Sequence, residues 1–248
     1  MPYAFLITIL LVSLLAACGG VPRPAKHSDA PKKMLWAWER PEDLTAFDPK
    51  EYGVAFLAQT LTLERDDLNF RPRRQPLKLA DGAYIVAVTR IETMKRTEQR
   101  PSYSDEQIER IVRFVKDSLN RPNVKGVQID FDVVVSERAF YRKLMKEIRS
   151  ALPKGTPLTM TALASWCLGD RWLQEMDVDE AVPMAFVMGA DTDRIRAFLN
   201  SGNDWPEPLC RESYGFSIDE PAINAADKNR RIYYFKNSAW DVESISSF

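Results

Sequence analysis

Eight short apolar runs, separated by segments of helical or loop character, are the feature that most constrains the fold of this 248-residue chain. Several runs are almost continuously apolar, which is typical of parallel strands buried on both faces. The runs span residues 34–38, 53–61, 83–89, 126–132, 158–165, 181–188, 214–218 and 231–235. Eight strands that alternate with helices in about 215 residues predict an α/β fold, a compact (β/α)8 TIM barrel.

The connecting segments carry helix signals of different strength. Ser104 and Gln107 have the spacing of a capping box, and apolar residues at helical spacing follow as far as residue 119. Ser136 and Asp191 are the expected N-caps of two further helices. The helices after runs one, five and seven are expected to be short or degenerate. An open doubly wound sheet is the alternative, but no Gly-rich phosphate-binding turn follows any run.

The N-terminus has the pattern of an export signal. Residues 5–17 are apolar, which is too short for a membrane span of about 20 residues but suits the core of a signal peptide. The stretch ends in Leu-Ala-Ala-Cys at Cys18 and resembles the lipobox of bacterial lipoproteins, which implies cleavage before Cys18 and its acylation, with palmitate for example. A buried N-terminal helix is the alternative. Because Gly19 follows the cysteine, the resemblance implies anchoring in the outer membrane of the cell envelope.

Residues 19–33 are rich in Pro, Gly and Lys and are expected to be a flexible tether. The predicted organisation is therefore a signal peptide at 1–17, a lipidated Cys18 and tether at 18–33, and one barrel domain at 34–248. Hydrophobic residues make up 45% of the chain, enough for a sizeable core, and the net charge of −1 gives no reason to expect a nucleic-acid partner.

Few residues of the barrel domain can serve as nucleophiles or metal ligands. The single histidine, His27, lies in the tether, which excludes Ser-His-Asp and Cys-His machinery and His-ligated zinc from the folded domain. Cys167 and Cys210 could pair in an exported protein. The strand assignment, however, puts them at opposite ends of a parallel barrel, so we expect them to be unpaired. No cofactor motif is present, so carboxylates are the candidate catalytic groups.

The most informative segment for function is residues 124–132. Successive side chains of a strand face opposite sides, so Gln128, Asp130 and Asp132 are expected to point into the barrel. Two shielded carboxylates on one face raise each other's pKa, which keeps one protonated as an acid. Barrel enzymes work at the C-terminal ends of their strands, where Asp132 is expected. The alternative is a structural polar cluster in which both aspartates bind Lys, Arg or Tyr side chains.

Residues 125–132 resemble the fourth-strand motif of chitinase-type glycoside hydrolases of family 18, Asp-Gly-x-Asp-x-Asp-x-Glu. Lys125 and Gln128 replace the first two acids, Asp130 keeps the third, and Asp132 stands where that family has its catalytic Glu. Residues 182–186 resemble the Met-x-Tyr-Asp motif of the sixth strand, with Met184 kept and Phe186 in place of the Tyr. The resemblance implies a TIM barrel and a carbohydrate ligand.

A second resemblance covers most of the mature chain. Residues 126–132, 161–167 and 179–184 are similar to an uncharacterised, often exported bacterial family, the domain of unknown function 3142. It implies a fold related to barrel hydrolases and brings no established activity.

Other expected strand ends supply further candidates. Glu92 and Asp219 are candidates for a second catalytic carboxylate, and Glu39 is a candidate substrate contact. An indole packs well on the apolar face of a sugar ring, so Trp166 and Trp38 are candidate binding platforms, with Met184 and Phe186 beside them. The alternatives are solvated or ion-paired loop charge and tryptophans that fill the barrel. No loop has calcium-binding spacing, so no metal site is predicted.

The sequence predicts a lipid-anchored barrel that hydrolyses a glycosidic bond in an envelope or extracellular polysaccharide. Asp132 is the expected acid, tuned by Asp130, with Gln128 as a nearby donor and Glu92 or Asp219 as the base or nucleophile. An N-acetyl group of the substrate can replace that nucleophile. A glycan-binding barrel without activity and an envelope scaffold that binds another protein are the competing interpretations.

Overall fold

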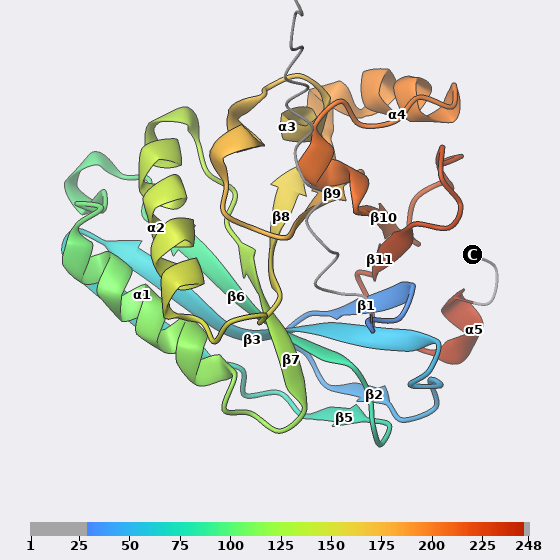
Figure 1. The fold of residues 1–248 in the computed structure, drawn as a ribbon, viewed down its shortest axis with the longest axis horizontal. Coiled ribbons are helices and arrows are strands. Elements are labelled where there is room, and N and C mark those ends of the chain that lie inside the picture. Colours follow the sequence, from blue (N-terminus) through green and yellow to red (C-terminus); the bar gives the residue numbers. More distant parts are fainter. Residues whose placement is uncertain (1–28, 246–248) are drawn as a thin grey trace, which may run out of the picture.

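A computed structural model describes residues 29–245 of the chain, and its main element is a closed barrel of eight parallel strands (Figure 1). The barrel strands follow in the order β1, β3, β6, β7, β8, β9, β10 and β11, and β1 pairs with both β3 and β11 to complete the ring. Their bounds are Lys33–Ala37, Tyr52–Glu64, Ile85–Thr93, Val124–Asp130, Leu158–Leu163, Glu180–Met184, Ser213–Ser217 and Arg231–Phe235. The (β/α)8 barrel is confirmed, and closure excludes the open sheet.

All eight predicted runs coincide with barrel strands, but some strands end earlier than the sequence pattern suggested. β7 ends at Asp130 instead of 132, and the chain then turns so that the Val133 N–H bonds the Phe131 carbonyl at 3.0 Å. β9 ends at Met184, and Val187 beyond it adopts φ +48°. Buried apolar residues such as Phe131 and Ala185 continue past these strand ends, which is why the pattern overestimates strand length.

Three short strands were not predicted. β4 (Asp67–Pro72) forms an antiparallel hairpin with the long strand β3 and occupies the place of a second helix. β2 (Glu42–Leu44) and β5 (Leu77–Leu79) form a separate two-stranded sheet. They lie at the lower edge of Figure 1.

Helices cover the outside of the barrel unevenly. α1 and α2 lie side by side on one flank in Figure 1. The α-helices are α1 (Asp105–Ser118), α2 (Arg138–Ala151), α3 (Ala164–Leu168), α4 (Thr192–Asn200) and α5 (Val242–Ile245). The 3-10 helices are η1 (Thr97–Gln99), η2 (Val135–Glu137), η3 (Trp172–Glu175), η4 (Gly189–Asp191) and η5 (Pro208–Arg211). As predicted, the connections after β1, β8 and β10 carry no helix or only short ones.

The capping signals were confirmed in part. Ser104 and Gln107 form both bonds of the capping box that starts α1. Asp191 is the N-cap of α4 without a side-chain cap bond, because its carboxylate binds Arg194 instead. Ser136 is not the N-cap of α2: that position belongs to Glu137.

Alternation along the strands separates two kinds of core. Met34, Trp36, Val86 and Phe235 belong to the cluster that fills the barrel, with other residues of the same strand faces. The intervening residues, such as Leu35, pack outward under helices and loops. Within the described residues no helix is long and apolar enough to cross a bilayer. The predicted signal peptide, Cys18 and most of the tether lie outside the described residues.

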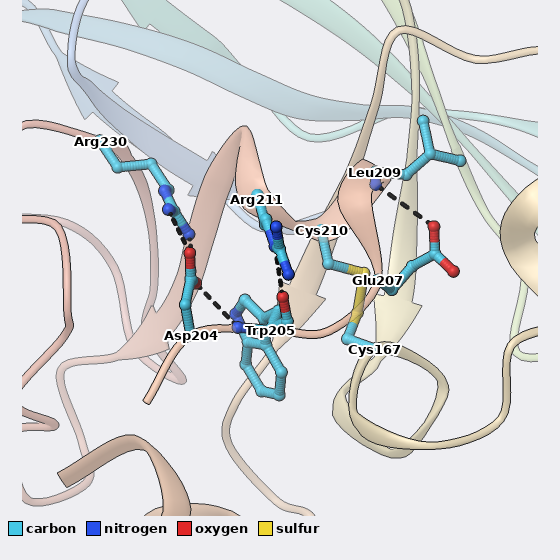
Figure 2. The surroundings of a disulfide bond; sticks show 8 residues. All are labelled: Cys167, Asp204, Trp205, Glu207, Leu209, Cys210, Arg211 and Arg230. Carbon is cyan, nitrogen blue, oxygen red and sulfur yellow. Dashed lines mark hydrogen bonds and ion pairs between the residues drawn. A yellow bond between two sulfur atoms is a disulfide. The ribbon is translucent and has the colours of Figure 1, made fainter. Parts of the chain in front are cut away.

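Cys167 and Cys210 form a disulfide with their Cα atoms 5.8 Å apart, so the expectation that they are unpaired was wrong (Figure 2). The reason is the stagger of the barrel. Leu163 at the end of β8 pairs with Met184, which pairs in turn with Gly215 in the middle of β10. The end of one strand is thus level with the middle of another two places away. Cys167 in α3 and Cys210 in η5 then meet in the same buried outer core.

The disulfide closes a loop of 43 residues, which predicts a measurable contribution to stability. In the chain-entropy model a loop of this length restricts the unfolded chain by about 4 kcal/mol. The double variant Cys167→Ala/Cys210→Ala should lose roughly this much unfolding free energy in guanidinium denaturation. Reductant should lower the midpoint of the wild type and leave that of the double variant unchanged. Equal midpoints for wild type and variant would contradict the prediction.

Candidate active site

A cleft of about 320 Å³ opens at the C-terminal ends of β6 and β7. Its lining combines acidic, basic and hydroxyl side chains from three neighbouring strands and the segments that follow them. The lining residues are Thr62, Arg90, Ile91, Glu92, Thr93, Met94, Lys95, Asp130, Phe131 and Asp132. Three predicted catalytic residues, Glu92, Asp130 and Asp132, therefore share one cleft.

Asp130 is buried at the floor of this cleft, where two groups bind its carboxylate. Thr161 donates a hydrogen bond of 2.8 Å to one oxygen, and the Arg90 guanidinium lies 3.3 Å from the other. Burial, and then the neighbouring charge of Asp132, raises the pKa of Asp130 to about 6, against the opposing effect of Arg90. Asp130 is therefore a carboxylate that titrates close to neutral pH.

Asp132 differs from Asp130 in its partners. Among residues 29–245, no hydrogen bond or ion pair binds its carboxylate. Its side chain reaches solvent, yet desolvation by the surrounding protein raises its pKa, while Arg90 and Lys95 oppose the rise. A carboxyl group that keeps its proton more readily than usual, and that is free of partners at a strand end, suits proton donation to a ligand.

Arg90 connects two of the carboxylates. Its Nε atom donates to Glu92 at 3.1 Å, and another nitrogen donates to Asp130. The guanidinium also lies over the ring of Trp38, 5.7 Å from its centre. Glu92, Asp130 and Trp38 lie at or just after the ends of three different strands, so Arg90 fixes the positions of these side chains relative to one another.

Gln128 lies beneath the cleft inside the barrel and does not reach it. Its amide oxygen accepts from the Trp36 indole at 2.9 Å, and its amide nitrogen donates to Thr159 at 3.1 Å. The side chain is fully buried, so the structure gives it a role inside the barrel instead of the predicted contact with substrate.

Three predicted binding residues gather at the barrel mouth beside the cleft. Trp38, Met184 and Phe186 are half-buried and pack against the core inside the barrel. Trp38 lies 4.2 Å from Trp36 between ring centres, and Phe186 lies 4.5 Å from Phe235. They form an apolar border along the side of the mouth formed by β1, β9 and β11.

Three other predicted residues are not part of this arrangement. Trp166 is buried in α3 against Trp172, outside the barrel, so it presents no open face for a sugar. Asp219 is exposed and accepts from the backbone N–H of Asn237. Glu39 is held by Arg71 on the β4 hairpin. Each prediction assumed that a residue after a strand points into the mouth, and here the following segment turns away.

Sequence reasoning did not assign six of the cleft residues to the site: Thr62, Ile91, Thr93, Met94, Lys95 and Phe131. Thr62 lies in the part of β3 that extends beyond the predicted run at 53–61, and the sequence pattern did not reveal that the strand is this long. The hydroxyl partner of Asp130, Thr161, occupies the position on β8 that alternation places inside the barrel. Thr161 could therefore have been predicted from the sequence, because every second residue of a strand faces the same side.

Neither a protein-family model nor a curated protein matches the sequence, so the similarity to the domain of unknown function 3142 stays a prediction. Solved structures do match. The spore cortex-lytic enzyme SleL of Bacillus cereus aligns with a TM-score of 0.50 and 13% identity over 76% of this chain. This chain covers only 51% of that enzyme.

Two chitinases also align with the chain. The Rhizomucor miehei chitinase RmChi1 has a TM-score of 0.46 and 14% identity, with 75% of this chain and 69% of that one covered. A family GH18 chitinase from Chromobacterium violaceum has a TM-score of 0.48 and 10% identity, with coverages of 88% and 86%. At 13% identity the alignment with SleL shows a similarity of fold alone.

The raised pKa of Asp130 predicts a pH dependence of stability. Between the ordinary pKa of an aspartate and about 6, the folded state binds more protons than the unfolded state, so unfolding free energy should fall as pH rises through this range. The difference approaches about 3 kcal/mol from a shift of roughly two units at 1.36 kcal/mol each. Asp130→Asn should remove this component in urea denaturation between pH 4 and 7.

The exposed Glu109 of α1 provides the control, because Glu109→Gln should leave the pH profile of the wild type intact. Parallel profiles for wild type and Asp130→Asn would show that Asp130 does not titrate in this range.

Proposed function

We propose that the cleft binds a glycan and that Asp132 protonates the leaving oxygen of a glycosidic bond. The observation that carries this proposal is the pair formed by Asp132, which has no partner in the described chain, and Asp130, which is buried and ion-paired. Two carboxylates in unlike environments at the end of a barrel strand can take unlike roles, one as the acid and one as a group that orients its neighbours.

Asp130 contributes to this reaction by tuning and orientation. The Asp130 carboxylate is bound on both oxygens and is buried, so it is poorly placed to transfer a proton to a ligand in the open cleft. The neighbouring charge of Asp132 raises the pKa of Asp130, and both aspartates line the cleft. The apolar border around Trp38 offers a surface for the C–H face of a sugar ring.

The nucleophile distinguishes two versions of the mechanism. Glu92 is in the cleft and is ion-paired with Arg90, whereas Asp219 lies outside the cleft lining. A two-carboxylate mechanism would therefore use Glu92. Because Asp132 is the cleft carboxylate that is free of partners, a substrate whose N-acetyl group attacks its own anomeric carbon fits the site better. This reading favours an N-acetylated glycan of the envelope or of the extracellular space.

Purified protein should hydrolyse at least one member of a panel that contains N-acetylated and non-acetylated glycans. Asp132→Asn should lower turnover by about 100-fold or more, with glycan affinity retained, because general acid catalysis is worth that much. In the wild type, kcat/KM should fall as pH rises through the raised pKa of Asp132, since the acid must carry its proton.

Asp219→Asn is the matched control and should leave turnover unchanged, because this exposed aspartate lies outside the cleft. Turnover that survives Asp132→Asn would eliminate Asp132 as the acid. Cleavage confined to non-acetylated glycans would eliminate the N-acetyl nucleophile and point to Glu92.

Glycan binding without cleavage is the second candidate. The ion pairs of Arg90 with Glu92 and Asp130 favour it, because they leave the cleft without a free second carboxylate. In that case the panel yields binding without turnover, and Trp38→Ala weakens binding while Asp132→Asn does not. A protein that binds no glycan fits the scaffold interpretation instead.

We also propose, on the sequence alone, that the barrel is lipid-anchored through Cys18 in the cell envelope. The support is the apolar stretch at 5–17 that ends in Leu-Ala-Ala-Cys. Cys18→Ala should abolish labelling by radioactive palmitate and either release the protein from the membrane fraction or leave the precursor uncleaved. Unchanged labelling and fractionation would contradict the anchor, whereas Cys167→Ala provides a cysteine control that should keep both.

A further inference from the structure

Glu137 is a buried carboxylate behind the cleft, at the end of η2, and it accepts hydrogen bonds from four donors. Only 2% of its surface is exposed. Its oxygens accept hydrogen bonds from Tyr103 at 2.8 Å, Thr93 at 2.9 Å and Lys95 at 3.2 Å, and from the backbone N–H of Val134 at 2.9 Å. These donors come from the end of β6, the segment before α1 and the turn after Asp132.

The turn after Asp132 has little else to hold it in place. Val134 and Val135 are 51% and 74% exposed, so they bury too little apolar surface to fix the chain. Val133 is buried and anchors one point of the turn. Glu137, at the end of η2, anchors the other, because its side chain accepts the Val134 N–H three residues back.

Glu137 also binds one of the cations of the cleft, Lys95. Lys95 lines the cleft and donates both to Glu137 and to Thr93, which is itself a cleft residue bound to Glu137. Burial alone would raise the pKa of Glu137, but its hydrogen bonds reverse the effect and lower it. The group is therefore an anion at neutral pH and attracts the Lys95 ammonium permanently.

We propose that Glu137 is the positioning residue of this site, which holds the Asp132 turn and the Lys95 ammonium at the edge of the cleft. The inference rests on the proposed function, since it is the acid Asp132 that is positioned. Glu137 acts through other residues and does not line the cleft itself. When the hydrogen bonds of Glu137 are lost, Asp132 moves away from the leaving oxygen, while every group that binds glycan is still present.

Two variants test the proposal in the full chain. Glu137→Gln removes the charge that holds Lys95, and Tyr103→Phe removes one hydrogen bond while the ring still packs on Phe140. Tyr103 is absent from the cleft lining, so Tyr103→Phe changes nothing that a ligand touches. Tyr52→Phe, at the start of β3 where the hydroxyl meets Lys33, is the matched control.

We expect kcat to fall about 10- to 100-fold in Glu137→Gln, as for a misplaced catalytic group, with KM unchanged. Tyr103→Phe should show a severalfold loss of the same kind. Hydrogen exchange in residues 131–137 should become about tenfold faster in both variants, since a bond to the turn is weakened or lost. Tyr52→Phe should change neither quantity. Where Glu137→Gln fails to fold, Tyr103→Phe decides alone.

Unchanged exchange in residues 131–137 overturns the positioning role, and so does unchanged kcat in a folded variant of an active enzyme. A wild type without turnover on any glycan refutes the proposed function. Exchange then still decides whether Glu137 holds the turn, so the two failures are distinguishable.

Discussion

Pairing of β1 with both β3 and β11 closes the sheet, and the location of every candidate functional group follows from that closure. In a closed sheet each strand has one face inside and one outside. Alternate residues of a strand therefore belong to two different cores, one inside the barrel and one between the barrel and its outer layer. The polar residues of the inner face then have two places to go. They either form bonds inside the barrel, as Gln128 does, or they reach the C-terminal mouth, as Arg90 and Asp130 do.

The pKa values of the carboxylates at the barrel mouth depend first on how far each group is exposed to solvent. A buried carboxylate without a partner costs several kcal/mol, so Asp130 is tolerated because Arg90 and Thr161 bind both of its oxygens. Asp132 keeps contact with solvent and needs no such partner. Asp130 and Asp132 lie two residues apart at the same strand end, but they differ in their partners and in their contact with solvent. Glu137 completes the arrangement from behind, where four donors balance one buried charge.

Prediction from the sequence succeeded for the barrel, and three of the proposed site residues lie together in one cleft at the ends of β6 and β7. Asp130 was expected on the inner face because a strand's alternation fixes which side a residue faces, whatever its neighbours are. Glu92 was expected after a strand end, and it lies in the cleft because β6 continues as far as Thr93. Trp166 and Asp219 were placed at the mouth because a residue after a strand was assumed to point inward. The direction of a connecting segment depends on what it packs against, and α3 folds outward over the barrel instead.

By itself the sequence determined the eight barrel strands, the stronger helices between them, and the pair of acids at the end of the fourth barrel strand. These depend on local patterns of apolar and polar residues, which act within a few residues of one another. Only the tertiary structure decided the stagger of the barrel, which brings Cys167 and Cys210 together, and the partners of each carboxylate. Both depend on contacts between residues far apart in the chain, and no single segment encodes the register in which two strands pair.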